Sequence, residues 1–378
     1  MNCYDSIKKP TLLIDRGRAQ ENIRRMAEKA RQEGVRFRPH FKTIQSGEAG
    51  EWFREHGVQS ITVSSLSMAG YFADFGWKNI TVAFPVNTRE ADALASLSED
   101  TDLSILLLDP SVAEEVNRIV RAPVGVFIKI DTGYGRTGLP WDDPAAVVDL
   151  AVHITSLERL EFRGLLAHAG HSYHMPLAAS RRELFDETAG RLNTLRDALR
   201  GAGIAECEIS VGDTPTATAV EHFRGVDEIR PGNFVYFDAQ QYHIGSCGES
   251  EIAAVVACPV VAVHPERGEC IVYGGAVHLS AQSEQYGDGE KMYGYAVPLA
   301  ELYDCGARSR AGWGAIDTGS YVRKVSQEHG VVKCSKELLE SLSPGGLLGI
   351  IPVHSCLAVD LLETAVDTAG IPVPLGRF

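Results

Sequence analysis

Lys42 is the residue of this chain whose type and setting best suit covalent chemistry. It stands at the end of the predicted strand VRFRPHFK, close to Arg38 and His40. Lysine is rare in a buried strand, and an amine placed among other cations suits a nucleophile or a Schiff base with a carbonyl compound. A surface lysine at a strand end is the alternative that this residue alone leaves open.

Further cations and histidines follow other predicted strands. They are Lys129 and Arg136 in KIDTGYGRTG, His168, His171 and Tyr173 in LLAHAGHSY, and Arg230 in EIRPGN. So many positive groups at one place would be costly to bury unless an anion or a cofactor lies among them. Arg136 could bind a carboxylate through two parallel hydrogen bonds, or could only face solvent. Arg230 could reach a cofactor ring nitrogen, or only pair with Glu228 or Asp227. His168 could stack on a planar ring, or only fill the core.

The segment GDTPTAT, which begins at Gly212, could bind a phosphate group. It is predicted to join a strand to a short helix, where free N–H groups and the hydroxyls of Thr214 and Thr216 would form a phosphate cradle. The alternative is an ordinary helix start, with Asp213 or Thr214 as the cap and Pro215 as the first helical residue. A (β/α)8 barrel often binds phosphate after its seventh and eighth strands, which favours the cradle.

His354 and Cys356 form a possible metal pair directly after the apolar run LLGIIPV. In a strand, residues two positions apart face the same side, so both side chains could bind one divalent metal. A nitrogen and a sulfur ligand together favour zinc. Two protein ligands would leave positions for water or substrate. A buried cysteine beside an unrelated histidine is the alternative.

The elements that must position these residues alternate between strands and helices from about residue 17 to 236. The strands are rich in β-branched residues and leucine, as expected where both faces of a parallel sheet are buried. Eight such units over roughly 220 residues predict a (β/α)8 TIM-like barrel. An open doubly wound sheet is disfavoured, because no GxGxxG follows the first strand. The predicted strands lie in VRFRPHFK, SITVSS, NITVAFP, LSILLLD, PVGVFIKID, LEFRGLLAHA, ECEISVGD and DEIRPGNFVYF. The first predicted helix runs from Arg16 to Gln32.

After Tyr242 the pattern changes to strand-like segments that glycine and proline interrupt. These segments are IAAVVACPVVAVH, ECIVYGGAVHL, YGYAVPL and LLGIIPV. They predict a mostly β second domain. We therefore expect a barrel domain at 17–242, and a β domain made of 1–16 and 243–378. The strand PTLLID near the start is expected to pair with that second domain.

Composition limits the partners of the protein. The chain has 378 residues and a formal net charge of -14, which argues against binding nucleic acid or an anionic membrane through general electrostatics. No stretch of sequence looks like a secretion signal or a membrane span. The eight cysteines include no CxxC pair, so we expect reduced thiols in a cytoplasmic protein.

Several motifs together resemble one enzyme family. In chain order they are PTLLID, RPHFKT, KIDTGYGRTG, LLAHAGHSY, VGDTPT, EIRPGNFVYFD and PVHSC. They resemble the D-threonine aldolase and D-serine dehydratase-like family, within the alanine racemase-type (fold type III) pyridoxal phosphate enzymes. The resemblance covers nearly the whole chain.

The resemblance implies that Lys42 binds pyridoxal 5'-phosphate as a Schiff base, at the mouth of an alanine racemase-type barrel. It places Arg230 near the pyridine nitrogen and His168 beside the ring. It makes Arg136 a candidate for binding the substrate carboxylate or the cofactor hydroxyl. Lys42, Arg136, His168 and Tyr173 are the expected catalytic residues. The expected cofactor-binding residues are Lys42, His168, Gly212, Asp213, Thr214, Thr216 and Arg230.

The resemblance also implies a divalent metal on His354 and Cys356, with zinc favoured and manganese possible. Members of the family are usually homodimers with composite active sites. Ile44 and Gln45 stand where the family commonly has histidine and lysine. A His-x-Cys pair is associated with dehydratases, and a His-x-Asp pair with aldolases.

These features predict a metal- and pyridoxal phosphate-dependent lyase acting on a small D-3-hydroxy amino acid. Elimination to a 2-oxo acid and ammonia, as in D-serine dehydratase, is the expected reaction because of Cys356. Retro-aldol cleavage to glycine and an aldehyde is the first alternative. A non-catalytic pyridoxal phosphate-binding protein and a barrel without cofactor are further ones. A racemase is disfavoured, because no second base is evident.

Overall fold

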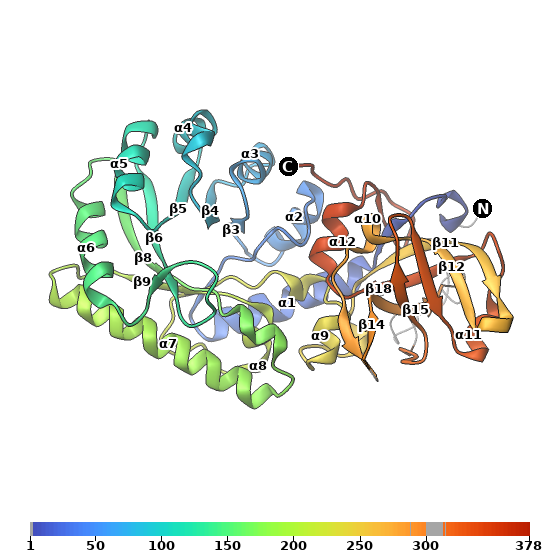
Figure 1. Ribbon diagram of the computed structural model, residues 1–378. Coiled ribbons are helices and arrows are strands. Elements are labelled where there is room, and N and C mark those ends of the chain that lie inside the picture. Colours follow the sequence, from blue (N-terminus) through green and yellow to red (C-terminus); the bar gives the residue numbers. More distant parts are fainter. Residues whose placement is uncertain (1–2, 288, 300–312, 314) are drawn as a thin grey trace. The chain divides into compact units, whose positions relative to one another are not determined.

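The computed structural model describes residues 3–287, 289–299, 313 and 315–378 (Figure 1). The chain forms two compact units. The first comprises Met1–Ile23, Thr43–Ala49 and Asn233–Leu375, and the second comprises Arg24–Lys42, Gly50–Gly232 and Gly376–Phe378. Both units are built from separate stretches of chain, and the expected domain ranges of 17–242 and 243–378 remain a prediction.

The second unit is a parallel barrel of eight main strands. Their order around the barrel is β2 (Arg36–Phe37), β10 (Glu228–Ile229), β9 (Glu208–Val211), β8 (Leu160–Leu166), β6 (Val124–Asp131), β5 (Asp102–Leu107), β4 (Asn79–Pro85) and β3 (Ser60–Val63). A bridge between His40 and Thr62 joins the first strand to the last, with Phe41 N donating to Thr62 O at 2.8 Å. This nearly closed barrel confirms the predicted fold. The short β7 (Leu139–Pro140) pairs with β6.

Helices cover the outside of the barrel, as Figure 1 shows for α3 to α6. The helices are α1 (Arg16–Gln32), α2 (Gly47–Arg54), α3 (Leu66–Asp74), α4 (Ala91–Asp100), α5 (Pro110–Ile119), α6 (Pro144–Thr155), α7 (Ala178–Gly201) and α8 (Thr214–Ala219). Several of these helices begin at a capping residue. Asp109 accepts from the backbone N–H groups of Ser111 and Val112, and proline follows the cap of α5.

The barrel interior combines an apolar layer with a buried ion pair. Leu106, Phe127 and Leu166 form the apolar layer, and Ala83 packs against it. Side chains alternate along a strand, so Lys129, two residues after Phe127, faces the same interior. Arg38 and Glu228 form the ion pair, with 2.7 Å between Nε and Oε2 and almost no exposure of either side chain. The ion pair lies toward the amino ends of the strands, because Glu228 begins β10 and Arg38 also donates to Asn79, the first residue of β4. Lys129 lies toward the carboxyl end of β6.

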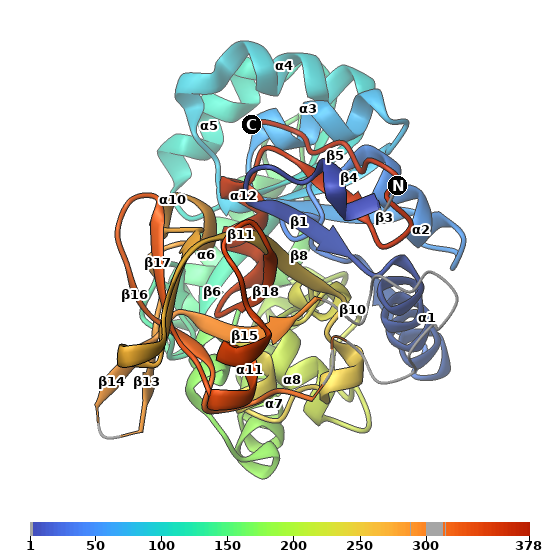
Figure 2. The same cartoon turned by 90° about the vertical axis from the view of Figure 1, so that its right-hand side faces the viewer.

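The first unit contains a six-stranded antiparallel barrel. Its strands follow the order β12 (Glu269–Tyr273), β17 (His329–Lys333), β16 (Tyr321–Val325), β15 (Gly294–Pro298), β18 (Leu347–Pro352) and β11 (Ala254–His264). The long β11 closes the barrel, because an irregularity between Val260 and Ala262 lets it pair with both β18 and β12. Figure 2 looks onto these strands.

Two shorter strands extend this second sheet. β1 (Thr11–Ile14) pairs with β11, which confirms the expected role of PTLLID, and β19 (Ala365–Asp367) runs parallel to β1. The structure differs from the sequence-based prediction at AVHL, which forms α10 (Ala276–Leu279) rather than a strand. The remaining elements are β13 (Glu284–Tyr286), β14 (Glu290–Met292), α9 (Ala239–His243), α11 (Lys336–Ser341) and α12 (Ser355–Leu361).

No helix in the described ranges has both the length and the apolar character needed to cross a bilayer. Of the eight cysteines, Cys305 lies outside the described residues, and six are free thiols: Cys207, Cys247, Cys258, Cys270, Cys334 and Cys356.

Gly164 is a position where the barrel tolerates no side chain. A Cβ there would lie 2.0 Å from the carbonyl oxygen of Glu208 on the neighbouring strand. We expect Gly164→Ala to lower the free energy of unfolding by about 1–3 kcal/mol, the usual cost of overpacking. Thermal unfolding monitored by circular dichroism measures this change.

Gly190 provides the matched control, because it lies in α7 with open space around its Cα. Gly190→Ala should raise the free energy of unfolding by about 0.5–1 kcal/mol through helix propensity. Equal melting temperatures for Gly164→Ala and the wild type would contradict the close approach of β8 and β9.

Candidate active site

Lys42 lies in a turn rather than at the end of a continuous strand. The strand β2 ends at Phe37, and regular pairing stops before Pro39, which has no N–H to donate to a sheet. The chain is still held in place, because His40 N donates to Pro231 O at 3.0 Å. Lys42 follows with its side chain half-buried. The predicted strand VRFRPHFK is therefore wrong in its second half.

The structure gathers Lys42 with four other predicted or neighbouring basic residues. Burial, and then the charges of Lys42, Arg230, His168 and Arg136, hold the pKa of His40 well below its usual value. Burial also holds the pKa of His168 well below its usual value, with the same lysine and arginines acting in the same direction. The two histidines are therefore neutral at pH 7, and the positive charge of the group rests on lysine and arginine.

Lys129 adds a buried amine to this group. Its Nζ donates to Ile130 O at 2.5 Å, and burial together with Arg230 and Arg136 lowers its pKa to about 7. Asp131 offsets this only in part, since its carboxylate accepts from the backbone N–H groups of Gly133 and Gly135. Burial is the largest cause of the low pKa, and the two arginines add to it. An anionic ligand would be stabilised there.

The guanidinium of Arg230 donates to a hydroxyl and a carbonyl oxygen, and not to the nearby carboxylates of Asp227 or Glu228. Its Nε donates to Ser210 Oγ at 2.7 Å, and its Nη2 donates to Ala167 O at 2.6 Å. Ser210 in turn donates to Glu228, which pairs with Arg38. Burial lowers the pKa of Arg230 to about 10, although Glu228 acts against the shift. The guanidinium is thus fixed in orientation and suited to donate to a further acceptor.

His168 has a defined tautomer and ring position. Its Nδ1 lies 2.5 Å from Gly212 O, so Nδ1 carries the proton and Nε2 the lone pair. The ring centroids of Tyr134 and Tyr173 lie 6.0 and 6.4 Å from that of His168. The Arg136 guanidinium lies over the Tyr134 ring at 5.4 Å. This places Arg136, His168 and Tyr173 in one cluster, with a neutral flat ring available for stacking.

The GDTPTAT segment begins α8, and Asp213 is its cap. Asp213 accepts from Thr216 N, from Thr216 Oγ1 and from Ser172 Oγ, each at 2.8 Å. The Thr216 hydroxyl proton is therefore used within the protein. A phosphate here would bind to backbone N–H groups and Thr214. A Cβ on Gly212 would lie 2.7 Å from Arg230 Cβ, so glycine lets this segment approach Arg230.

The metal pair lies at the start of a helix and not in a strand. The strand β18 ends at Pro352, His354 is the cap of α12, and Cys356 belongs to its first turn. The argument from residues on one face of a strand is therefore wrong. Within the described residues there is no group of three or more His, Cys, Asp or Glu side chains placed to bind a metal. A metal bound by this pair would have two protein ligands.

Both members of the pair nevertheless have side-chain neighbours at hydrogen-bonding distance. Cys356 Sγ lies 3.1 Å from Thr43 Oγ1 and 3.9 Å from Asn233 Nδ2. His354 Nδ1 lies 3.2 Å from Gln282 Oε1. Sequence reasoning missed these three neighbours. Thr43 and Asn233 stand inside the RPHFKT and EIRPGN motifs, which could have drawn attention to them, whereas no pattern singled out Gln282.

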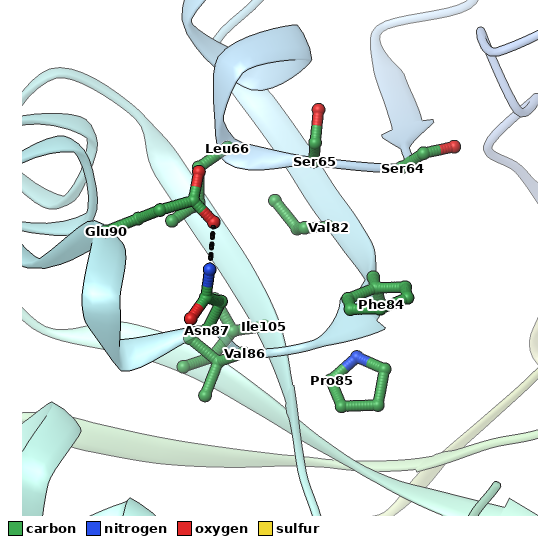
Figure 3. A pocket seen from close by; sticks show the side chains of 10 residues that line it. All are labelled: Ser64, Ser65, Leu66, Val82, Phe84, Pro85, Val86, Asn87, Glu90 and Ile105. Carbon is green, nitrogen blue, oxygen red and sulfur yellow. Dashed lines mark hydrogen bonds between the residues drawn. The ribbon is translucent and has the colours of Figure 1, made fainter.

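A pocket of about 290 Å³ lies outside this group of cations (Figure 3). Ala83 faces the barrel interior, so its neighbours Val82 and Phe84 face outward, toward the pocket. The only charged residue in the lining is Glu90, which accepts a hydrogen bond from Asn87 at 2.9 Å. The lining residues are Ser64, Ser65, Leu66, Val82, Phe84, Pro85, Val86, Asn87, Glu90 and Ile105. This mostly apolar pocket is a poor match for an anionic cofactor.

Comparison with known proteins identifies the family. Residues 14–240 match the alanine racemase N-terminal domain, and residues 253–366 match the putative serine dehydratase domain. The chain therefore belongs to the alanine racemase N-terminal domain family and carries a serine dehydratase domain after it.

Relatives match over most of their length. D-threo-3-hydroxyaspartate dehydratase of Delftia sp. (strain HT23) is 30% identical over 92% of this chain and 90% of its own. Its solved structure has a TM-score of 0.88 and covers 100% of this chain and 99% of that one, at 26% identity. D-serine dehydratase of Dictyostelium discoideum is 27% identical over 95% of this chain and 93% of its own. A 3-hydroxy-D-aspartate aldolase of Paracoccus denitrificans is 26% identical over 74% of each chain.

This membership makes the chain an enzyme, a pyridoxal phosphate-dependent lyase of D-amino acids. The alternative of a non-catalytic binding protein is therefore set aside. Three features of the site fit pyridoxal phosphate. Buried cations such as Lys129 would stabilise its negative charge, the neutral ring of His168 could stack on its ring, and Gly212 leaves space before the start of α8.

The low pKa of Lys129 predicts a pH-dependent stability of the cofactor-free protein. Folded Lys129 gives up its proton near pH 7, whereas an unfolded lysine keeps it to about pH 10.4. Below pH 7 the full cost of burying the charged amine is present, and this cost is relieved as the pH rises. Relative to Lys129→Met, the wild type should therefore gain up to about 1.4 kcal/mol per pH unit between pH 7 and 10.

Urea unfolding of both proteins at pH 6, 7, 8 and 9 measures this difference. A constant difference in free energy of unfolding across that range would mean that Lys129 has an ordinary pKa.

Proposed function

We propose that this enzyme is a metal- and pyridoxal phosphate-dependent dehydratase of a small D-3-hydroxy amino acid, which it converts to a 2-oxo acid and ammonia. The observation that carries the proposal is the group formed by Lys42, Lys129, Arg136, His168 and Arg230 at the carboxyl ends of the barrel strands. It joins an amine suited to a Schiff base with an excess of buried positive charge.

The cofactor would be held by residues with distinct roles. Lys42 would bind its aldehyde carbon, Arg230 would donate to its ring nitrogen, and His168 would lie against the ring face. Backbone N–H groups at the start of α8, with Thr214, would bind its phosphate. When bound, pyridoxal phosphate supplies an electron sink that stabilises negative charge at the substrate Cα.

The remaining residues would bind the substrate and move its protons. Besides binding the cofactor, Lys42 Nζ would take the proton from the substrate Cα. Arg136 would bind the substrate carboxylate with two parallel N–H donors or contact the cofactor hydroxyl. Its position over Tyr134 restricts the guanidinium to few orientations, which favours one substrate pose. Tyr173, beside His168, is proposed to complete this catalytic group.

His354 and Cys356 would bind the divalent metal, for which their nitrogen and sulfur favour zinc, with manganese as the alternative. A metal there would supply a Lewis acid for the leaving hydroxyl. A solved variant of D-threo-3-hydroxyaspartate dehydratase (TM-score 0.87, 26% identity) is described as being in the metal-free form, which supports a metal in this group of enzymes. Cys356 favours elimination, and we propose a homodimer.

Cleavage to glycine and an aldehyde is the second candidate, because a relative is named 3-hydroxy-D-aspartate aldolase. The same lysine, arginine and metal pair could serve it. The two reactions differ in whether the Cβ–O bond or the Cα–Cβ bond breaks.

The identity of the cofactor lysine has a direct test. Reduction of the purified enzyme with borohydride should fix the cofactor to Lys42 and to no other residue, because the reduced imine is stable. Peptide mass spectrometry locates the adduct. Lys42→Ala should lose the adduct and reduce activity by at least about 10³-fold, the scale expected for loss of a covalent and proton-transfer group. An adduct on Lys129 would overturn the assignment.

The reaction has a product test. The enzyme with zinc or manganese is given D-serine, D-threonine and D-threo-3-hydroxyaspartate, and both 2-oxo acid and glycine are measured. We expect 2-oxo acid and ammonia in equal amounts, lost on chelation and in Cys356→Ala. Glycine without ammonia would establish the aldolase instead, with glyoxylate as the second product from D-threo-3-hydroxyaspartate. Activity that survives chelation would remove the metal from the proposal.

A further inference from the structure

Thr43 and Gln282, both in the first compact unit, are the nearer side-chain neighbours of the metal pair. Thr43 Oγ1 lies 3.1 Å from Cys356 Sγ, and Gln282 Oε1 lies 3.2 Å from His354 Nδ1. The four residues come from three distant parts of the chain, so the tertiary structure alone brings them together. Neither contact can be attributed to local helix capping, because His354 has no side-chain cap bond in α12.

The contact of Thr43 suits a cysteine that binds metal as a thiolate. The Thr43 side chain is fully buried and Cys356 is 6% exposed, so water has little access to replace this hydrogen bond. A thiolate accepts hydrogen bonds well, and the thiolate is the form of cysteine that binds metal. Asn233 Nδ2 lies farther from the same sulfur, at 3.9 Å, and donates at shorter distances to Asp238 Oδ2 and Ser355 Oγ. Thr43 is therefore the nearer hydrogen-bonding neighbour of the sulfur, and its hydroxyl can donate.

The contact of Gln282 selects the tautomer of His354. An amide oxygen can only accept, so Nδ1 of His354 carries the proton and Nε2 keeps its lone pair. Nε2 is then the nitrogen whose lone pair would bind a metal. The same hydrogen bond fixes the plane of the ring, which sets the direction of that lone pair.

We propose that Thr43 and Gln282 are the positioning residues of the metal pair, Thr43 by hydrogen bonding to the sulfur of Cys356 and Gln282 by orienting the ring of His354. This inference rests on the proposed function, in which His354 and Cys356 bind a divalent metal. It assigns to Thr43 a task different from that of Lys42, the residue directly before it in the chain. It also gives a role to Gln282, which lies outside every motif of the sequence.

The test measures metal binding rather than activity. Cobalt(II) is titrated into the full-length, metal-free protein, and the sulfur-to-cobalt charge-transfer absorption reports the Cys356–metal bond. Zinc affinity follows from competition with a chelator. Thr43→Val and Gln282→Met should each bind either metal about 10–100-fold more weakly, the usual cost of losing an outer hydrogen bond. Thr43→Ser and Gln282→Glu keep the hydroxyl or the acceptor oxygen and should bind nearly as the wild type does.

Thr81→Val is the matched control. Thr81 is a fully buried threonine of the barrel whose hydroxyl has no hydrogen-bond partner among the described residues, so its loss should leave metal affinity unchanged. Position and intensity of the charge-transfer band at saturating cobalt give a second readout. We expect the band to shift in Thr43→Val and to stay in place in Gln282→Met, because Thr43 contacts the sulfur of Cys356 whereas Gln282 contacts His354.

The outcomes separate the two proposals. If neither the wild type nor any variant binds cobalt or zinc, the metal in the proposed function fails. If the wild type binds metal through His354 and Cys356 but Thr43→Val and Gln282→Met bind as tightly as Thr81→Val, the positioning roles are overturned and the metal pair remains. If Thr43→Val does not fold, Thr43→Ala is compared with Thr43→Ser instead. Equal metal affinities of these two variants would overturn the positioning role of Thr43.

Discussion

Excess positive charge in a nearly closed barrel is the constraint on which this structure depends. Lys129 and Arg230 are buried among further cations, and burial lowers the pKa of both. The free-energy cost of burying these cations is offset when a ligand of opposite charge binds beside them. The interior acids are already used: Glu228 pairs with Arg38, and Asp213 caps α8. Asp131 offsets the charge of Lys129 only in part, so an anionic cofactor would suit this barrel.

The same acids give the site its rigidity. Glu228, Ser210 and Arg230 form a chain of hydrogen bonds across neighbouring strands, so the guanidinium has one orientation. Gly212 allows Arg230 to pack against the start of α8, and the Gly212 carbonyl fixes His168. Preorganised groups of this kind need little rearrangement when a ligand binds. The barrel therefore provides orientation as well as charge.

The antiparallel unit contributes chemistry of another type. His354 and Cys356 stand where β18 ends and α12 begins, and each has a hydrogen-bonding neighbour from a distant segment. One short motif, RPHFKT, supplies both Lys42 and the threonine that contacts Cys356. A single stretch of chain thus takes part in the lysine site of one unit and in the sulfur site of the other.

The sequence by itself determined the barrel, the order of its strands and the residues worth testing. These features depend on short stretches of sequence, and the structure retains them. They are the alternating apolar runs, the helix caps Asp109 and Asp143, and the cations that follow the strands. Only the tertiary structure decided between the alternatives that the local sequence left open. Arg230 bonds to Ser210 and Ala167 instead of Glu228 or Asp227, and HSC begins a helix instead of extending a strand. The contact between Gln282 and His354 could not be predicted, because a contact between distant segments produces no pattern in the local sequence.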